Sequence, residues 1–424
     1  MSGRKKWFFL LAAVVFTADV WGQVAPSPFS SFGIGTPYGN GLVNNQGNGL
    51  GVAQPQFWYV NNQNPALLVF NTLSVFQVGI VGESRRVRGD TISEKSTGGN
   101  LSYITFAFPI KPGRITTSAG LTPYTNLNFS YQYQDYARDP LGAIADTLTT
   151  RETGSGGLTQ IYLSNGVRIN DDMSVGAKIS YLFGPVSRVY STNSGGSDPF
   201  FANIEDKKNL RGINIGLGYS FSKDSLGRNH NKRLSIGATY NFVTDLSATR
   251  ISRIYRTTIV GDTIEKFPIS TTKGKIRLPQ SFTVGAAYGK GLNWSVGTEF
   301  SYQDWSTYND FSSPEAHNLG KSWRATVGGE YTADPLALEN YLKRITLRLG
   351  ATYEQQPFYA NGTQVKDYGI NFGFSAPTGR SSVDVAFKVG KIGNKTDNIL
   401  EETYFKIYFG LTFNDQWFIK RKFD

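Results

Sequence analysis

The residues that most often carry enzymatic chemistry are scarce in this chain of 424 residues. It has no cysteine and only two histidines, His230 and His317. A serine hydrolase needs a histidine within hydrogen-bond reach of its nucleophile, and neither histidine falls in a segment with strand alternation. Without cysteine, thiolate chemistry, disulfides and a thiolate-ligated zinc ion are excluded. We therefore expect that the chain is not an enzyme and holds no catalytic residue, metal ion or cofactor.

Two other motifs have simpler interpretations than catalysis. The run GNGLG at 47–51 is glycine-rich like a phosphate-binding loop, but it lacks the Lys-Ser/Thr pair and no helical pattern follows it. Its glycines more simply permit tight turns. The acidic pair Asp171 and Asp172 lies in a predicted turn and is expected to face water.

The first 22 residues have the three parts of a secretory signal. Arg4, Lys5 and Lys6 precede an apolar run from Trp7 to Ala18, and small Gly22 follows. A transmembrane anchor is the alternative, but about 12 apolar residues are fewer than the roughly 20 that span a bilayer as a helix. We expect a signal peptide at 1–22 and export of the rest.

The charge pattern argues against nucleic acid. The formal charge is +11, and removing three lysine or arginine residues and Asp19 with the signal leaves +9, since 11 − 3 + 1 = 9. A nucleic-acid partner needs basic residues gathered on one surface. Here they are spread over turns, loops and one face of the predicted strands.

From Leu73 onward the chain repeats a run of about ten residues with period 2, followed by a turn. In the last run, Phe405, Ile407 and Phe409 share one face, and Lys406 and Tyr408 share the other. Such alternation suits a membrane barrel with one face in lipid and one in the lumen. A soluble sandwich would instead need a second apolar layer, whereas the inward faces are rich in Gly, Ser, Thr, Asn, Lys and Arg.

Lysine or arginine on the lipid face near the midplane costs about 2–4 kcal/mol. That cost selects the register that sends five basic residues inward: Lys178, Arg324, Arg348, Lys388 and Lys406. In the first strand the same reasoning is weakest, because Gln77 and Gly79 fall on its expected lipid face.

We predict an all-β fold, a single-chain transmembrane antiparallel β-barrel of about 14 strands with an N-terminal hatch, or plug, in the lumen. The predicted strands are 73–83, 101–110, 115–134, 157–168, 172–185, 208–223, 232–245, 275–289, 293–304, 320–332, 343–355, 366–377, 380–392 and 402–413. The barrel domain is expected at 71–413 and a periplasmic tail at 414–424.

The predicted connections alternate in length. They are short at 111–114, 169–172, 290–292 and 378–379, and long at 84–100, 135–156, 186–207, 246–274 and 305–319. Short turns are typical of the periplasmic rim, so both termini are expected in the periplasm. One connection, 333–343, predicts a short helix with Pro335 in its first turn.

Residues 23–70 lack strand alternation and are rich in glycine and asparagine. A flexible leader is one interpretation. Apolar residues such as Phe29, Phe32, Ile34, Trp58 and Leu67 are more frequent than in a disordered tail. We therefore favour a folded hatch.

Several motifs are similar to the long-chain fatty-acid transporter (FadL) family of bacterial outer-membrane barrels, in its Bacteroidetes branch. Asn64-Pro65-Ala66 resembles the end of that family's hatch, and GLTPYTN at 120–126 resembles its kinked third strand. The runs GSGGLTQIYLSNGVRI at 154–169, MSVGAKISYLFG at 173–184, YQDWS at 302–306 and NDQWFIKRK at 414–422 extend the resemblance along the chain.

The resemblance implies passive uptake of hydrophobic or amphipathic, fatty-acid-like small molecules, with outer-membrane lipid and a hydrophobic ligand as partners. It implies a ligand gate at Asn64, Pro65 and Ala66. It also implies a lateral exit at the third-strand kink, formed by Gly120, Pro123, Tyr124 and Asn126. The alternative is a structural or accessory subunit of an outer-membrane protein secretion or assembly complex, with protein partners.

Proline cannot donate to a β ladder, so Pro123 must disturb the pairing of its strand. A plain bulge that bends the strand without opening the wall is the simpler alternative. Backbone groups freed at an opening would need new partners, and we expect Asn126, Asn128 or Asn64 to supply them.

Overall fold

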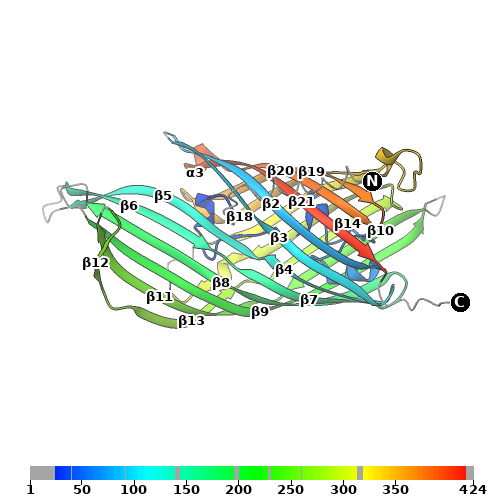
Figure 1. Cartoon of the computed structure of the whole chain (residues 1–424), viewed down its shortest axis with the longest axis horizontal. Helices are drawn as coiled ribbons and strands as arrows, with labels where there is room; N and C mark the ends of the chain where they lie inside the picture. The colour runs from blue at the N-terminus through cyan, green and yellow to red at the C-terminus, as the bar shows by residue number, and fades with distance from the viewer. Residues whose placement is uncertain are drawn as a thin grey trace, which may run out of the picture.

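The computed structural model describes residues 24–39, 41–90, 92–138, 144–194, 200–227, 231–258, 260–312 and 319–416. The predicted signal peptide, both histidines and residues 417–424 of the predicted tail lie outside these ranges. Figure 1 shows a closed wall of tilted strands around short internal segments.

Fourteen antiparallel strand paths form the wall, and four of them are each divided into two elements. The first seven paths are β2 (Ser74–Arg88), β3 (Ser93–Lys111), β4 (Ile115–Pro123) with β5 (Thr125–Arg138), β6 (Ile144–Gly156) with β7 (Thr159–Arg168), β8 (Met173–Ser194), β9 (Phe200–Leu226), and β10 (Lys232–Asn241) with β11 (Thr244–Thr258). The other seven are β13 (Ser270–Leu278) with β14 (Ser281–Lys290), β15 (Trp294–Asp304), β17 (Lys321–Thr332), β18 (Thr346–Ala360), β19 (Thr363–Thr378), β20 (Ser381–Gly393) and β21 (Glu401–Asp415).

The last strand pairs with the first, from Ser74 opposite Asp415 to Arg88 opposite Glu401, and so closes the barrel. The predicted 14-stranded barrel with an internal hatch is therefore confirmed. Smaller elements complete the fold: η1 (Pro28–Ser30), β1 (Thr36–Pro37), α2 (Val43–Gln46), η2 (Pro65–Phe70), β12 (Thr263–Lys266), η3 (Trp305–Thr307), β16 (Asn309–Asp310), η5 (Tyr341–Arg344) and α3 (Lys395–Asn398). Among the residues described, no helix has the length and apolar character needed to cross a membrane.

The alternation of strand β21 has the predicted orientation, since Phe405, Ile407 and Phe409 are exposed on the outer face while Tyr404 and Tyr408 are buried inside. The five basic residues expected in the lumen lie there. They bond or pack against inner groups: Lys178 with the Asn62 carbonyl, Arg324 with Glu354, Arg348 with Glu330, and both Lys388 and Lys406 with the Tyr404 ring. The predicted inward register of these strands is confirmed.

The predicted register of the first strand is wrong. Gln77 is buried in the lumen, where its side chain accepts a hydrogen bond from the Val60 amide at 2.7 Å and donates one to Thr412 at 2.9 Å. Gly79 also faces inward, because a Cβ there would lie 2.6 Å from the Tyr103 ring. Phe76 and Ile80 face outward instead.

Several predicted long loops are strand. The connection between β2 and β3 is 89–92 rather than 84–100, and β9 is 27 residues long. At about 3.4 Å per residue β9 extends roughly 90 Å, whereas a membrane strand needs only about 9–11 residues. Residues 200–207 of β9, which were predicted as loop, lie beyond the length that a bilayer covers, so no apolar alternation marks them in the sequence.

The helix predicted at 333–343 is also wrong. The connection between β17 and β18 consists of turns and the short 3₁₀ helix η5. Asp334 and Asn340 each accept a hydrogen bond from the amide two residues ahead. The Asp334 bond stabilises a turn in competition with a longer helix, and the Asn340 bond caps η5 at its start.

The register of β21 can be tested by placing arginine on either face of the same strand. Phe409→Arg puts a cation in lipid and should lower the free energy of unfolding by about 2–4 kcal/mol if the site is near midplane. Lys406→Arg keeps a cation in the lumen and should leave stability near wild type. Folding into lipid vesicles measures both, and equal losses would contradict the assigned faces.

Candidate functional site

The wall is interrupted between strands β3 and β5. Strand β3 pairs with β4 only from Ile104 to Lys111, and its residues 93–103 pair with β2 alone. Strand β5 pairs with β6 on one side and does not continue the β3 ladder. Residues 92–138 are all described, so this part of the wall contains a gap.

The gap begins at the predicted kink. Gly120 and Leu121 are the last β4 residues that pair with β3, and the next β3 residue, Tyr103, has no partner in β4. On the other side, Pro123 still pairs with Thr159 of β7. Tyr124 then separates β4 from β5, and its amide donates to the Leu158 carbonyl at 2.7 Å. The path therefore leaves β3 after Leu121, two residues before Pro123, which has no N–H to donate.

Residues 24–38, which we call the strap, lie along the free edge of β5. The two-residue strand β1 pairs Thr36 with Asn126 and Pro37 with Thr125. The Tyr38 amide donates to the Tyr124 carbonyl at 2.8 Å. The strap therefore replaces β3 as the hydrogen-bonding neighbour at the start of β5.

Asn128 is the most heavily bonded residue on this edge. Its carbonyl accepts from the Ser27 amide at 2.8 Å, its amide donates to the Ser30 hydroxyl at 3.1 Å, and its side chain donates to the Val24 carbonyl at 2.5 Å. The freed backbone groups of Asn128 are satisfied by Ser27 and Ser30 of the strap rather than by an asparagine side chain, and Asn64 bonds elsewhere.

The strap approaches β5 closely at Gly35. A Cβ on Gly35 would lie 2.3 Å from the Asn126 carbonyl oxygen, and its φ of +93° is one that other residues rarely adopt. Glycine is therefore needed at this position for the pairing seen at β1.

Buried charges hold the first residues of the strap. Glu83 accepts from the Ala25 amide at 2.7 Å, and Glu402 accepts from the Ser27 hydroxyl at 2.5 Å. Arg85 lies between the two carboxylates and bonds to both. Lys406 lies 3.4 Å from Glu83 and supplies a second positive charge. The two carboxylates are therefore compensated, and the strap uses oxygens that remain free.

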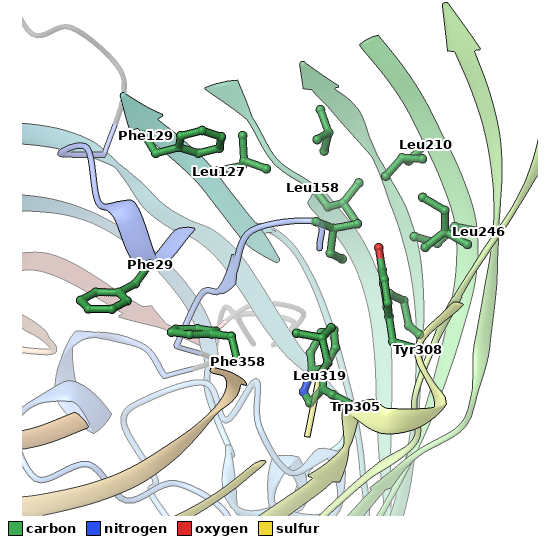
Figure 2. Close-up of a cluster of buried hydrophobic side chains, with 14 of the residues drawn as sticks. Phe29, Leu127, Phe129, Leu158, Leu210, Leu246, Trp305, Tyr308, Leu319 and Phe358 are labelled. Carbon is green, nitrogen blue, oxygen red and sulfur yellow. The ribbon is translucent and has the colours of Figure 1, made fainter. Parts of the chain in front are cut away.

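Behind the strap, apolar side chains fill the lumen. We call this group the lumen cluster. It contains Phe29 and Ile34 of the strap and wall or loop residues that include Leu127, Phe129, Leu158, Leu210, Leu246, Trp305, Tyr308, Leu319 and Phe358 (Figure 2). Phe32 stacks on Phe358 with ring centroids 4.7 Å apart. The cluster joins the strap to the side of the barrel opposite the gap.

Two small hollows border the strap. One is lined mainly by apolar groups, including Phe29, Phe32, Trp305 and Phe358. The other lies beside Gly33, next to charged residues of the wall. Each has room for about one water-sized sphere. The lumen at this level is packed rather than open.

Charged groups flank the second hollow. Arg188 donates to the Ser31 carbonyl at 2.6 Å and to the Gly33 carbonyl at 3.0 Å. Lys208 lies 2.7 Å from Asp310. Burial acts to raise the pKa of Asp310, but Lys208 and Ser312 outweigh it, so this pKa lies below its usual value. The carboxylate therefore stays charged beside the strap.

The residues Asn64, Pro65 and Ala66, expected to form a gate, lie deeper in the lumen. The Asn64 side chain donates to the Val52 carbonyl at 2.8 Å and to the Tyr219 carbonyl at 3.0 Å. The Ala66 carbonyl accepts from Ser174 at 2.9 Å. The structure thus anchors this motif to the wall, apart from Gly120, Pro123, Tyr124 and Asn126.

Glycines of the wall make the rest of the hatch fit. A Cβ on Gly350 would lie 2.1 Å from the Asn48 carbonyl oxygen, and one on Gly237 would lie 2.0 Å from that of Val52. Glu299 accepts from the Gly51 amide at 2.6 Å and from the Val52 amide at 2.5 Å. Sequence reasoning missed these contacts, although inward glycines in strands are a general sign of close backbone approach.

No three potential ligands among His, Cys, Asp and Glu come together as a metal site within the described ranges.

A family model described as BamG matches residues 4–424. The chain belongs to the BamG family. No match is found among curated protein sequences.

Several solved structures share the fold of this BamG family member. The CymD monoaromatic hydrocarbon channel is 14% identical, with 91% of this chain and 99% of that one covered and a TM-score of 0.57. The toluene transporter TodX of Pseudomonas putida is 14% identical, with 93% of this chain and 100% of that one covered and a TM-score of 0.54. A FadL homologue of Pseudomonas aeruginosa is 14% identical, with 87% of this chain and 96% of that one covered and a TM-score of 0.56. The FadL resemblance is therefore confirmed at the level of fold, and the Bacteroidetes branch stays a prediction.

The close fit of hatch and wall can be tested with one methyl group. Gly350→Ala should force the hatch away from Asn48 at a cost of about 1–3 kcal/mol, typical of overpacking. We expect faster protease cleavage of the hatch in a barrel that still folds. Gly82→Ala is the matched control, since a Cβ there comes no closer than 3.4 Å to the Ile407 side chain. Equal cleavage of both variants would contradict the tight fit.

Proposed function

We propose that this chain lies in the bacterial outer membrane, with both termini in the periplasm, and allows passive uptake of hydrophobic or amphipathic small molecules. In this proposal, a molecule enters the lumen from the long-strand end and leaves sideways into the bilayer between β3 and β5. The strap is the gate of this exit.

The observation that carries the proposal is the replacement of a wall strand by a separable segment. Only two residues of the strap, Thr36 and Pro37, form a β pair with the wall. Displacing the strap would open the wall without breaking a ladder between two barrel strands. The freed edges of β3 and β5 would then need water or ligand as partners.

The lumen cluster supports a hydrophobic rather than a polar cargo. Phe29, Phe32 and Ile34 leave the lumen if the strap moves, and the remaining apolar wall then forms a cavity in contact with the gap. Ligand sites in proteins are typically concave and mostly apolar, with a few polar groups. Lys208 is paired with Asp310. Arg188 bonds to strap carbonyls, so it would be released when the strap moves and suits the carboxylate of an amphipathic cargo.

We propose that Asn64, Pro65 and Ala66 act as the fixed base of the gate. Their bonds to Val52, Tyr219 and Ser174 hold the lower hatch. Movement is then confined to the strap. Gly120, Pro123, Tyr124 and Asn126 form the hinge side of the exit in this proposal.

A second function is favoured by the dense packing of the lumen. The two hollows admit about one water each. The strand paths from β4–β5 to β13–β14 continue well beyond the length that a bilayer needs. Both features suit a structural or accessory subunit of an outer-membrane secretion or assembly complex, whose partners would bind the extended wall.

The gate can be locked by a disulfide, because the chain has no cysteine. Thr36 and Asn126 are directly opposite in the β1–β5 pair, at a separation that suits a disulfide. In the variant Thr36→Cys with Asn126→Cys, oxidation should block transfer of a labelled fatty acid into vesicles that contain the protein. Reduction should restore it.

The matched control is Thr332→Cys with Thr346→Cys, which joins two neighbouring wall strands far from the strap. Its oxidation should leave transfer unchanged. Transfer that persists in the locked variant contradicts the exit at the gap. No transfer by either protein or by wild type favours the subunit function.

A further inference from the structure

The connection between β17 and β18 exposes four large apolar side chains to solvent. Leu336, Leu338 and Leu342 are 82%, 100% and 73% exposed, and Tyr341 is 45% exposed. We call residues 333–345 the finger. Exposed apolar residues gathered in one short segment mark a surface that meets a partner or a membrane.

The finger is a self-contained structure. The Asp334 amide donates to the Lys343 carbonyl at 2.9 Å and closes its base. Asp334 also accepts from the Leu336 amide at 3.0 Å, and Asn340 accepts from the Leu342 amide at 3.0 Å. These bonds fix the backbone while the leucine side chains stay free of the rest of the chain.

The finger joins the end of β17 to the start of β18 at the rim of the wall. Its flanking strands bring Tyr331 opposite Leu347, and both side chains point outward. It lies at the end of the barrel with the short turns, because the Thr332 amide donates to the Asn293 carbonyl in the β14–β15 turn at 2.6 Å. Figure 1 shows this connection standing clear of the wall, past the ends of β18 and β19.

We propose that the finger is a membrane-interface anchor that inserts Leu336, Leu338 and Leu342 into the phospholipid leaflet at the short-turn end. The main support is continuity, since the apolar band of the wall leads through Tyr331 and Leu347 directly into the finger. Apolar segments that lie in the interface bury this kind of surface a few ångströms into the headgroup and acyl boundary.

The residues at the base of the finger match that position. Tyr341 has the amphipathic ring that is enriched at membrane interfaces. Lys343 and Arg344 follow it, and the Arg344 guanidinium lies 5.8 Å from the Tyr341 ring centre. Cations at this level meet the phosphates of the headgroups. Asp334 and Glu339, the acidic residues of the finger, are exposed and would face water.

A labelled cysteine tests this inference in a chain that has none of its own. Leu338→Cys would carry an environment-sensitive fluorophore in vesicles of phosphatidylcholine and phosphatidylglycerol. Asp171→Cys, in the exposed β7–β8 turn at the same end, is the matched control. We expect severalfold stronger quenching at position 338 than at 171 by a lipid nitroxide near the headgroup, and weaker quenching by aqueous iodide.

A second variant separates insertion from folding. Leu336→Ser with Leu342→Ser, labelled at position 338, should lose most lipid quenching while the barrel keeps its circular dichroism spectrum and resistance to detergent. Equal iodide quenching at 338 and 171, with no lipid quenching at either, would overturn the proposal. So would a label that is shielded from iodide only in native envelopes, since the finger would then bind a protein.

Discussion

A β-barrel in lipid is stable only if every backbone N–H and C=O in its wall has a partner, because an unsatisfied group in hydrocarbon costs several kcal/mol. Strand-to-strand ladders satisfy this condition around most of the wall. Between β3 and β5 they do not, because the β4–β5 path leaves β3 after Leu121. The strap meets the condition there, through β1 and through the bonds of Asn128. The N-terminal segment is therefore part of the wall as well as part of the plug.

The same segment depends on the lumen behind it. Its first residues bond to Glu83 and Glu402, whose charges are balanced by Arg85 and Lys406. Its aromatic residues pack in the lumen cluster, while the lower hatch fits against glycines such as Gly350. Removing the strap from the gap would leave the lower hatch with its own contacts. This division makes a movable strap on a fixed hatch physically reasonable.

Membership of the BamG family and a fold shared with hydrocarbon channels do not by themselves define the function, because one fold can serve several. The relevant difference is mechanical. A channel requires the strap to exchange with a cargo, whereas a structural subunit requires it to stay in place. The small size of the hollows beside Phe29 and Gly33 favours a strap that stays in place, as in a structural subunit. The short β pair of the strap, only two residues long, favours a strap that can be displaced, as in a channel.

The sequence by itself determined the 14 strands, the inward basic residues and the kink at Gly120 and Pro123. Each depends on a local pattern, namely period 2, the cost of a cation in lipid, or the missing N–H of proline. Those patterns fail where both faces of a strand are wet, so residues 200–207 of β9 were predicted as loop. They also misassigned Gln77, whose polarity is satisfied by Thr412 of a strand 335 positions away.

The residues at the break between β4 and β5 were therefore predictable, but their partner was not. Nothing local to Asn128 shows that Ser30, 98 positions earlier, would bond to it. Only the closed barrel brings the strap to the free edge of β5 and places Asn64 against another part of the wall, at Tyr219 of β9. The tertiary structure decided this because backbone hydrogen bonding is indifferent to side-chain type, so any exposed edge accepts whichever segment the fold places beside it.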